Sequence, residues 1–362
     1  MAAQDILSNL AVPNVRCSRW DGISFSYDRF VESGGDLSSW EEGPDYIFTN
    51  TGIPLFRDEF DTMVMIEHVR FEDGRLTAIL QPDVVRGQNI IPAGERIAVG
   101  ECLVRENALI RPSHLNLLAS GGVLQVPVLH RPRVAVLTSG NELVSCWDSP
   151  APGQTTQSNS LSMCAKLKEW GAEPVLFPTT KDDCDALMAR LTEAAAMVDL
   201  IVIGGGSGKG KHDLLQSATE QAGRLFFSSV EHGPGKRTCF ALVDQTPVIG
   251  LVGPPGGEEM TFDFYVLPAV KACLGQPYQP MMVEAVLEED IPPHTRTDFY
   301  YTMKVRVSED GTEYLARPLP HAGLDRSIAE HNGYLFVRKA GGGYQKGDRV
   351  WVEVRTGCEY LV

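Results

Sequence analysis

A glycine-rich loop at the end of an apolar strand constrains this chain more than any other feature. Residues 201–213 read IVIGGGSGKGKHD: the apolar run Leu200–Ile203 ends at three glycines, and further glycines alternate with lysines before Asp213. Backbone N–H groups of such a loop can approach an anionic ligand because no Cβ blocks them. A flexible surface turn is the alternative, although it explains one or two glycines but not the lysines and the acid. The loop therefore favours a site for a phosphate or a similar anion.

Two kinds of protein carry a loop of this form. Residues Gly205–Lys211 fit the P-loop of nucleotide hydrolases, but His212 stands where that loop has the hydroxyl that binds Mg²⁺. The loop also resembles S-G-G-x-S-x-G-x-x-D of the molybdopterin molybdotransferase family, which includes MoeA-type proteins and the E domain of gephyrin. The positions in register with that family are Gly205, Gly206, Gly210 and Asp213. The loop alone does not decide between the two.

Further motifs occur in the order that the molybdotransferase family has them, from about Ser18 to Val362. Residues 134–143 read VAVLTSGNEL and resemble the family's strand followed by T/S-x-G-D/N-E-L. The other stretches that resemble family motifs are Ser18–Gly22, Thr51-Gly52 with Asp61, Gly153–Asn159, Lys181–Asp183, Pro234–Lys236 and Gly250–Pro255. Each motif is weak alone, but their ordered succession identifies the chain as similar to this family over most of its length.

Composition agrees with a soluble protein of several domains. The chain has 362 residues, 43% of them hydrophobic, and lacks an apolar stretch of the roughly 20 residues that a transmembrane helix needs. Residues 1–15 lack the features of a signal peptide, so we expect a cytoplasmic protein. The eight cysteines form no C-x-x-C pair, which argues against a zinc site or a disulfide framework. A net charge of −15 argues against a nucleic-acid partner.

The chain divides into a short N-terminal segment and four further parts. We expect residues 1–15 to be that segment, residues 16–105 to form a small β-rich domain, and residues 106–130 to be a helical linker region containing the helix His114–Ser120. Residues 131–275 alternate strands with helices, which predicts an α/β domain whose mostly parallel sheet is covered on both faces. Residues 276–362 return to strands and predict a C-terminal β-barrel domain. The fold class is therefore a multidomain α/β protein with a three-layer α/β/α centre.

Specific elements follow from the apolar patterns. In the α/β domain we expect strands or helices at Val134–Leu137, Ser160–Trp170, Val175–Phe177, Asp183–Ala196, Leu200–Ile203, Leu214–Ala222, Val248–Leu251 and Glu259–Leu274. In the β-rich domain we expect strands at Tyr46–Phe48, Thr62–Ile66, Leu76–Leu80 and Arg96–Val99. In the barrel we expect Val283–Leu287, Phe299–Val307, Tyr314–Pro318, Gly333–Val337 and Arg349–Val354.

Three acids follow different strands of the predicted sheet: Glu142, Asp182 and Asp213. A single acid at such a place is usually a helix cap or a solvated residue. Three acids on loops at one sheet edge instead favour a Mg²⁺ site, because this hard cation binds carboxylate and phosphate oxygens. The resemblance places the same three residues at the family's metal and pterin-phosphate site.

The resemblance also implies a set of ligand-binding residues. We expect the cofactor-binding residues to be Thr138, Ser139, Gly140, Ser158, Asn159, Gly205, Gly206, Gly210, Pro234, Gly235, Lys236, Pro254 and Pro255. Lys236 has the alternative of being an ordinary solvated lysine. The catalytic set adds Asp21 and Thr51 of the β-rich domain to the three acids, and in the family's arrangement these two come from a second subunit.

The activity implied by the resemblance is insertion of molybdate into adenylylated molybdopterin with release of AMP, in molybdenum cofactor biosynthesis. Such a reaction needs Mg²⁺, a pocket for a polyanion and an oxyanion site. We expect a homodimer, with cofactor-biosynthesis proteins or molybdoenzymes as protein partners. The alternative is a non-catalytic molybdopterin carrier or assembly protein, because Ile91, Arg96 and Gly233 depart from the family pattern.

Overall fold

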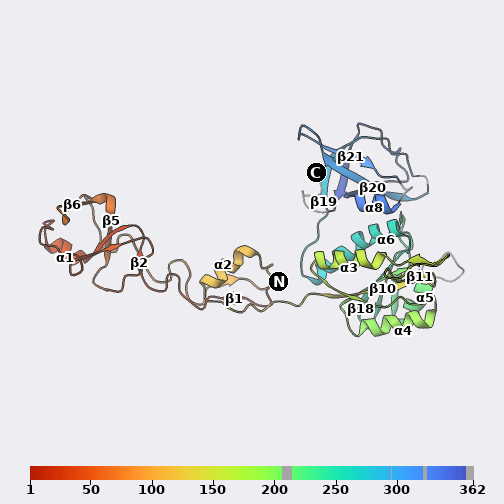
Figure 1. The fold of residues 1–362 in the computed structure, drawn as a ribbon, viewed down its shortest axis with the longest axis horizontal. Helices are drawn as coiled ribbons and strands as arrows, with labels where there is room; N and C mark the ends of the chain where they lie inside the picture. The colour runs from red at the N-terminus through yellow and green to blue at the C-terminus, as the bar shows by residue number, and fades with distance from the viewer. Residues whose placement is uncertain (206–213, 295, 321–323, 356–362) are drawn as a thin grey trace. The chain divides into compact units, whose positions relative to one another are not determined.

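The computed structural model describes residues 1–205, 214–294, 296–320 and 324–355. The chain forms two compact units, Met1–Leu129 and His130–Val362. The second unit holds the predicted α/β domain and the C-terminal barrel, both drawn in Figure 1. Predictions for Gly206, Gly210 and Asp213 lie outside the described residues.

A six-stranded sheet forms the centre of the α/β domain. Its order is β13 (Glu173–Leu176), β10 (Arg133–Ser139), β14 (Leu200–Gly205), β18 (Thr246–Leu251), β17 (Cys239–Val243) and β15 (Arg224–Phe227). The first four strands are parallel to one another, as predicted. The prediction missed β17, which pairs antiparallel with β18, and β15, which pairs antiparallel with β17. A two-residue turn, Asp244-Gln245 with positive φ angles of 47° and 69°, joins β17 to β18 as a hairpin.

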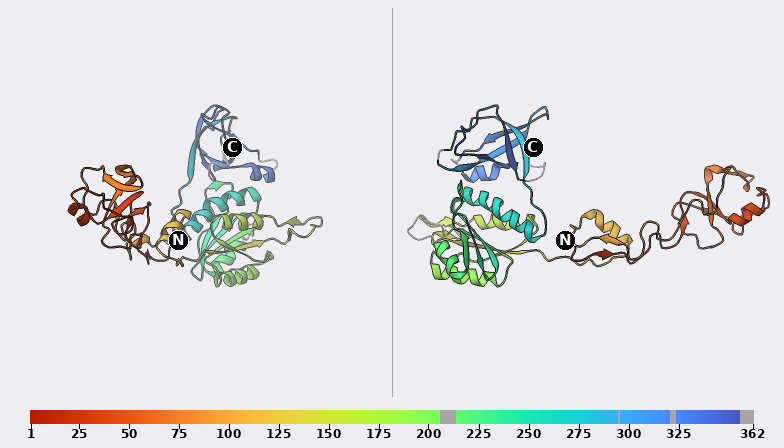
Figure 2. Two further views of the ribbon diagram at one scale, coloured as in Figure 1. Left: turned by 60° about the vertical axis from the view of Figure 1, so that its left-hand side comes forward. Right: turned by 180° about the vertical axis from the view of Figure 1, so that it is seen from behind.

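Helices cover both faces of this sheet (Figures 1 and 2). On one face lie α3 (Asn159–Glu169), α6 (Pro255–Thr261), the π-helical turn η2 (Phe262–Val266) and α7 (Leu267–Cys273); on the other lie α4 (Cys184–Ala195) and α5 (Leu214–Ala222). The sequence of β14 is apolar throughout because both faces of this strand are buried. Ile201 and Ile203 pack in the core beneath α4 and α5, whereas Val202 packs in the core beneath α3. A strand buried on both faces has no polar side to alternate with.

Local sequence explains where α4 begins and which face it buries. The Asp183 carboxylate accepts a hydrogen bond from the Ala186 N–H at 2.9 Å and caps the helix. Leu187 and Leu191, four residues apart, are fully buried against the sheet. The prediction of this helix is confirmed to within one residue at each end.

The C-terminal domain is a closed five-stranded barrel. Its strands are β19 (Met281–Leu287), β20 (Asp298–Val307), β21 (Tyr314–Pro318), β22 (Gly333–Val337) and β23 (Arg349–Val354), with α8 (Leu324–Glu330) beside them. The barrel closes because β20 pairs with both β21 and β22. All five strands confirm their predictions, and the short strand β16 (His232–Gly233) from the preceding segment adds to β20.

The N-terminal unit contains small sheets and two short helices. The described elements are β1 (Ile6–Leu7), β2 (Cys17–Ser18), β3 (Gly22–Phe25), α1 (Tyr27–Glu32), β4 (Tyr46–Thr49), β5 (Thr62–Met65), the 3₁₀ turn η1 (Ile66–His68), β6 (Val69–Glu72), β7 (Arg75–Ile79), β8 (Ile90–Ile91), β9 (Cys102–Val104) and α2 (Pro112–Ser120). The strand expected at Arg96–Val99 is wrong, because only Ile97 forms a bridge, to Val12. Glycine turns at Gly94 and Gly100, both with positive φ, leave too short a segment for a strand.

None of the helices in the described parts of the chain is long and apolar enough to cross a membrane.

Candidate functional site at the carboxyl edge of the sheet

The loops after β10 and β13 meet through Asp182. The Ser139 hydroxyl donates to Asp182 Oδ1 at 2.5 Å, and the Asn141 N–H donates to Asp182 Oδ2 at 3.3 Å. In return the Asp182 N–H donates to the Asn141 side-chain oxygen at 3.2 Å. The neighbouring Asp183 caps α4, so the two adjacent acids have different roles. The structure thus brings together Ser139 and Asp182, two of the predicted site residues.

The glycines at the end of β14 lie directly beside β10. Gly205 pairs with Ser139 in register and has a φ of 92°, a conformation that disfavours any residue with a Cβ. A Cβ built on Gly205 would also overlap the Ser139 carbonyl oxygen. Close packing of two strand ends therefore requires glycine at position 205.

We predict that Gly205→Ala destabilises the protein by roughly 2–3 kcal/mol, because it adds a backbone clash to an unfavourable φ. Thermal unfolding measures this, with Gly153→Ala as the matched control. Gly153 has a similar φ of 88° but open space around its Cβ position, so its substitution should cost only ~1 kcal/mol. Equal costs for the two variants would contradict the clash.

A second pair of loops meets beside Gly205. Asn159, at the start of α3, donates from its side-chain amide to the Gly253 carbonyl at 3.3 Å. A Cβ on Gly253 would lie 3.6 Å from the Gly205 Cα, so the turn after β18 sits against the end of β14. Pro254 and Pro255 then begin α6, with Pro255 at its first position, where its missing N–H costs nothing. These predicted residues form one continuous edge with Ser139 and Asp182.

The Pro234–Lys236 turn packs against α6. Gly235 has a φ of 93°, and a Cβ there would overlap the Thr261 side chain. The Lys236 side chain is exposed, and its main-chain carbonyl accepts from the Val230 N–H at 2.9 Å. The turn is therefore held by its backbone, and the lysine is left accessible to solvent.

Other predicted residues have more varied surroundings. Thr138 is buried and hydrogen-bonds to the Thr179 hydroxyl at 3.1 Å, so it is internal to the domain. Gly140 follows β10, and its N–H donates to the Thr180 carbonyl at 3.2 Å. Ser158 is exposed and precedes α3 without capping it. Glu142 is exposed, and its side chain makes no hydrogen bond or ion pair with the described residues, Asp182 included.

Asp21 and Thr51 meet each other within the N-terminal unit. The Thr51 N–H donates to Asp21 Oδ1 at 2.7 Å, and the Thr51 hydroxyl donates to the same oxygen at 3.1 Å. The pair is exposed to solvent. The structure therefore joins the two catalytic candidates of that unit.

Sequence reasoning missed Glu258, which lies at the same edge of the sheet. Only 3% of Glu258 is exposed, and a Cβ on Gly204 would overlap its Oε1 atom. Burial, with a smaller contribution from the Glu259 charge, raises the pKa of Glu258 from 4.5 to about 9. The sequence near Glu258 carried no signal for this, because the residue it packs against, Gly204, is distant along the chain.

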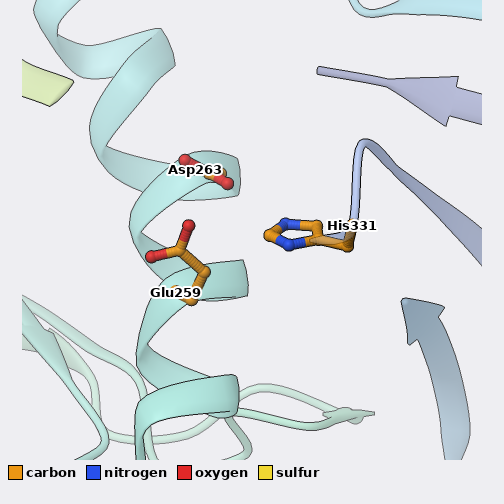
Figure 3. Close-up of side chains that lie close together, drawn as sticks. All are labelled: Glu259, Asp263 and His331. Atoms are coloured by element: carbon orange, nitrogen blue, oxygen red, sulfur yellow. The ribbon is translucent and has the colours of Figure 1, made fainter. Parts of the chain in front are cut away.

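Charged side chains also meet where α6 faces the barrel. Glu259, Asp263 and His331 are close enough for a metal ion to join them, as Figure 3 shows. However, Lys166 pairs with both carboxylates, at 2.7 Å from Asp263 Oδ1, and Arg355 lies 3.0 Å from Asp263 Oδ2. These cations already neutralise the acids.

Both ring nitrogens of His331 also contact protein groups. Its Nδ1 contacts the Ile328 carbonyl at 2.6 Å, and its Nε2 contacts the Tyr334 hydroxyl at 2.9 Å. Burial lowers the pKa of His331, which favours the neutral ring. We therefore interpret the cluster as an ion-pair network between the α/β domain and the barrel.

Comparison with known proteins gives two family matches along the chain. Residues 1–122 match the MoeA N-terminal region (domain I and II), and residues 135–272 match the probable molybdopterin binding domain. The second match spans the six-stranded sheet and the loops at its carboxyl edge.

Similar full-length proteins agree. The molybdopterin molybdenumtransferase of Bacillus subtilis (strain 168) is 29% identical over 97% of this chain and 86% of its own length. That of Staphylococcus aureus (strain MSSA476) is 26% identical over 96% of this chain and 87% of its own. A crystal structure of a molybdopterin biosynthesis MoeA protein from Pyrococcus horikoshii has the same fold, with a TM-score of 0.80, 24% identity and coverage of 99% of this chain and 92% of that one. The chain belongs to the MoeA-like, molybdopterin molybdotransferase family.

Proposed function

We propose that this protein is a molybdopterin molybdotransferase, which inserts molybdate into adenylylated molybdopterin with release of AMP in molybdenum cofactor biosynthesis. The observation that carries the proposal is the convergence of Ser139, Asp182, Gly205 and Gly253 at one sheet edge, within the segment that matches a probable molybdopterin binding domain. Exposed backbone at strand ends is suited to bind an anionic ligand. Lys236, exposed near this edge, can add positive charge.

Asp182 and Glu142 would hold Mg²⁺ together with ligand phosphate, and Asp213 is the third proposed ligand. The Ser139 hydroxyl and the Asn141 main-chain N–H fix both Asp182 oxygens, while the Glu142 carboxylate is free of described partners. Carboxylate oxygens fit this hard cation. The ion would polarise the phosphoanhydride. The protein side chains orient the ligand and keep its phosphates at the loop.

The test is release of AMP from adenylylated molybdopterin, measured with and without molybdate. We expect molybdate-dependent AMP release from the wild type. Asp182→Asn should lower its rate by about 100-fold or more, as for loss of a charge-stabilising group, and leave molybdopterin affinity within about tenfold. Glu169→Gln, at an exposed acid at the end of α3, is the matched control and should not change the rate.

A non-catalytic carrier is the second candidate, and two observations favour it. Ile91 is buried in β8 opposite Cys17, so position 91 offers no polar group to a ligand. A Cβ on Gly233 would lie 2.9 Å from the Phe299 ring, so β20 leaves no room for a longer side chain there. Molybdopterin binding without AMP release would establish the carrier. ATP hydrolysis without molybdopterin binding would instead revive the P-loop hypothesis.

We also propose that the protein is a cytoplasmic homodimer. In that arrangement the Asp21–Thr51 pair would serve the site of a second subunit, and cofactor-biosynthesis proteins or molybdoenzymes would be its protein partners. Asp21 and Thr51 are exposed and hydrogen-bonded to each other, which supports a role in ligand binding and not only in packing. Sedimentation velocity gives the subunit number, and a monomer at all concentrations would refute the dimer.

A further inference from the structure

Glu258 is a buried acid that lacks a partner at the edge where the ligand is proposed to bind. Its side chain contacts Gly204, the next-to-last residue of β14. None of the described residues donates a hydrogen bond to its carboxyl group or forms an ion pair with it. A buried polar group without a partner is unfavourable, because it has lost its hydrogen bonds to water and gained none. Such a group at a binding edge points to a partner supplied by the ligand.

The surroundings of Glu258 define the kind of partner. The strand β14 presents Gly204, α3 presents the Met163 methyl group, and neither is charged. The nearest acid, Glu259, pairs with Lys166 and adds negative potential. Because none of the described cations pairs with Glu258 and burial disfavours its charged form, its carboxyl group takes the neutral, protonated form and is a hydrogen-bond donor. A phosphate beside Glu258 would find no cationic partner among the described residues, whereas an uncharged acceptor needs none.

Resting on the proposed function, we propose that Glu258 donates a hydrogen bond to an uncharged acceptor of the pterin ring, a ring nitrogen or carbonyl oxygen. The glycine pair Gly204-Gly205 lets the flat ring approach the strand end, and Lys236 binds the phosphate. Glu258 is then a specificity residue for the pterin. It does not bind the nucleotide or its phosphates.

Two variants distinguish the hydrogen-bond donor of Glu258 from its ability to ionise. Glu258→Gln keeps a donor of similar size that cannot ionise, and Glu258→Met removes the donor but fills the same space. At pH 7 we expect molybdopterin to bind Glu258→Gln within about threefold of the wild type. Glu258→Met should bind it about tenfold more weakly, the effect of one lost hydrogen bond. Affinity for AMP, which carries phosphate but no pterin, should change less than twofold in both variants.

The pH dependence gives an independent readout that does not require Glu258→Met to fold. The ratio of wild-type to Glu258→Gln affinity for molybdopterin should stay constant below pH 8 and fall between pH 9 and 10, as the wild-type carboxyl group ionises. The glutamine variant corrects for titration of the ligand itself. Unchanged affinity in a folded Glu258→Met variant, or a flat ratio up to pH 10, overturns the inference alone. A wild type that does not bind molybdopterin overturns the proposed function and the inference together.

Discussion

Glu258→Gln should become more stabilising as the pH rises, by up to about 4 kcal/mol between pH 5 and pH 8. The folded protein holds a proton on Glu258 up to a pKa of about 9, whereas the unfolded chain releases it near 4.5. Between these values the unfolded state binds fewer protons, so wild-type stability falls as the pH increases. Each pH unit within the window contributes about 1.4 kcal/mol. Glutamine cannot ionise, and the variant escapes this loss.

Denaturant unfolding at pH 5, 6, 7 and 8 measures the effect. The free energy of unfolding of Glu258→Gln should exceed that of the wild type by a margin that grows at each step. Glu169→Gln, an exposed acid on α3, should show no such growth. A constant difference between Glu258→Gln and the wild type would mean that the folded protein does not keep Glu258 protonated.

Most of the fold could be predicted from the sequence because its core strands have a strong apolar pattern. The run Leu200–Ile203 is apolar throughout and forms the middle of a sheet that is buried on both faces. The barrel strands alternate, as Arg349–Val354 does, with Val350, Val352 and Val354 buried. Such patterns report burial directly. The domain bounds derived from them stay predictions.

The missed strands β15 and β17 show where this reasoning fails. β15 is the edge strand and β17 lies next to it, and Phe226 and Phe227 of β15 are partly exposed. Exposed aromatic residues give no alternation to detect. The better signal was the Asp244-Gln245 turn, whose positive φ angles suit a hairpin. A search for periodic spacing of apolar residues does not detect the residues that favour such a turn.

The site was only partly predictable for a different reason. Motif spacing pointed to Ser139 and Asp182, and the structure joins them by a hydrogen bond. The choice of Asp182 over Asp183 agreed with the helix expected from Asp183, which caps α4 in the structure. Glu258 was not predicted as a site residue because its unusual property is burial against Gly204, a residue 54 positions away. No local sequence pattern records such a long-range contact.

The ion-pair network between α6 and the barrel concerns stability and not ligand binding. Arg355 directly follows the last barrel strand, β23, and its guanidinium lies 4.4 Å from the Tyr334 ring centroid and 3.0 Å from Asp263 Oδ2. Asp263 belongs to the helical segment after α6, so this one side chain connects the two domains. The side chain of Asp263 is 2% exposed and that of Arg355 is 10% exposed. Neither charge can be satisfied by water if its partner is lost.

Arg355→Met should therefore destabilise the protein by about 3–5 kcal/mol, the cost of leaving one member of a buried ion pair without its partner. Lys166 cannot compensate, since it already serves both Asp263 and Glu259. Thermal and denaturant unfolding measure the loss, with Arg349→Met as the control. Arg349 pairs with Glu313 at the surface, where its side chain is 55% exposed, and its removal should cost far less than that of Arg355.

A double variant separates lost charge from lost packing. Asp263→Leu combined with Arg355→Met removes both charges and should recover most of the stability lost in Arg355→Met, because no carboxylate that has lost its arginine remains buried beside position 355. If packing against Tyr334 were the main contribution, the double variant would be no more stable than Arg355→Met. If Arg355→Met were as stable as Arg349→Met, the network would not hold the barrel to the α/β domain. The expected recovery instead makes the Asp263–Arg355 charge pair the connection on which the packing of these two domains depends.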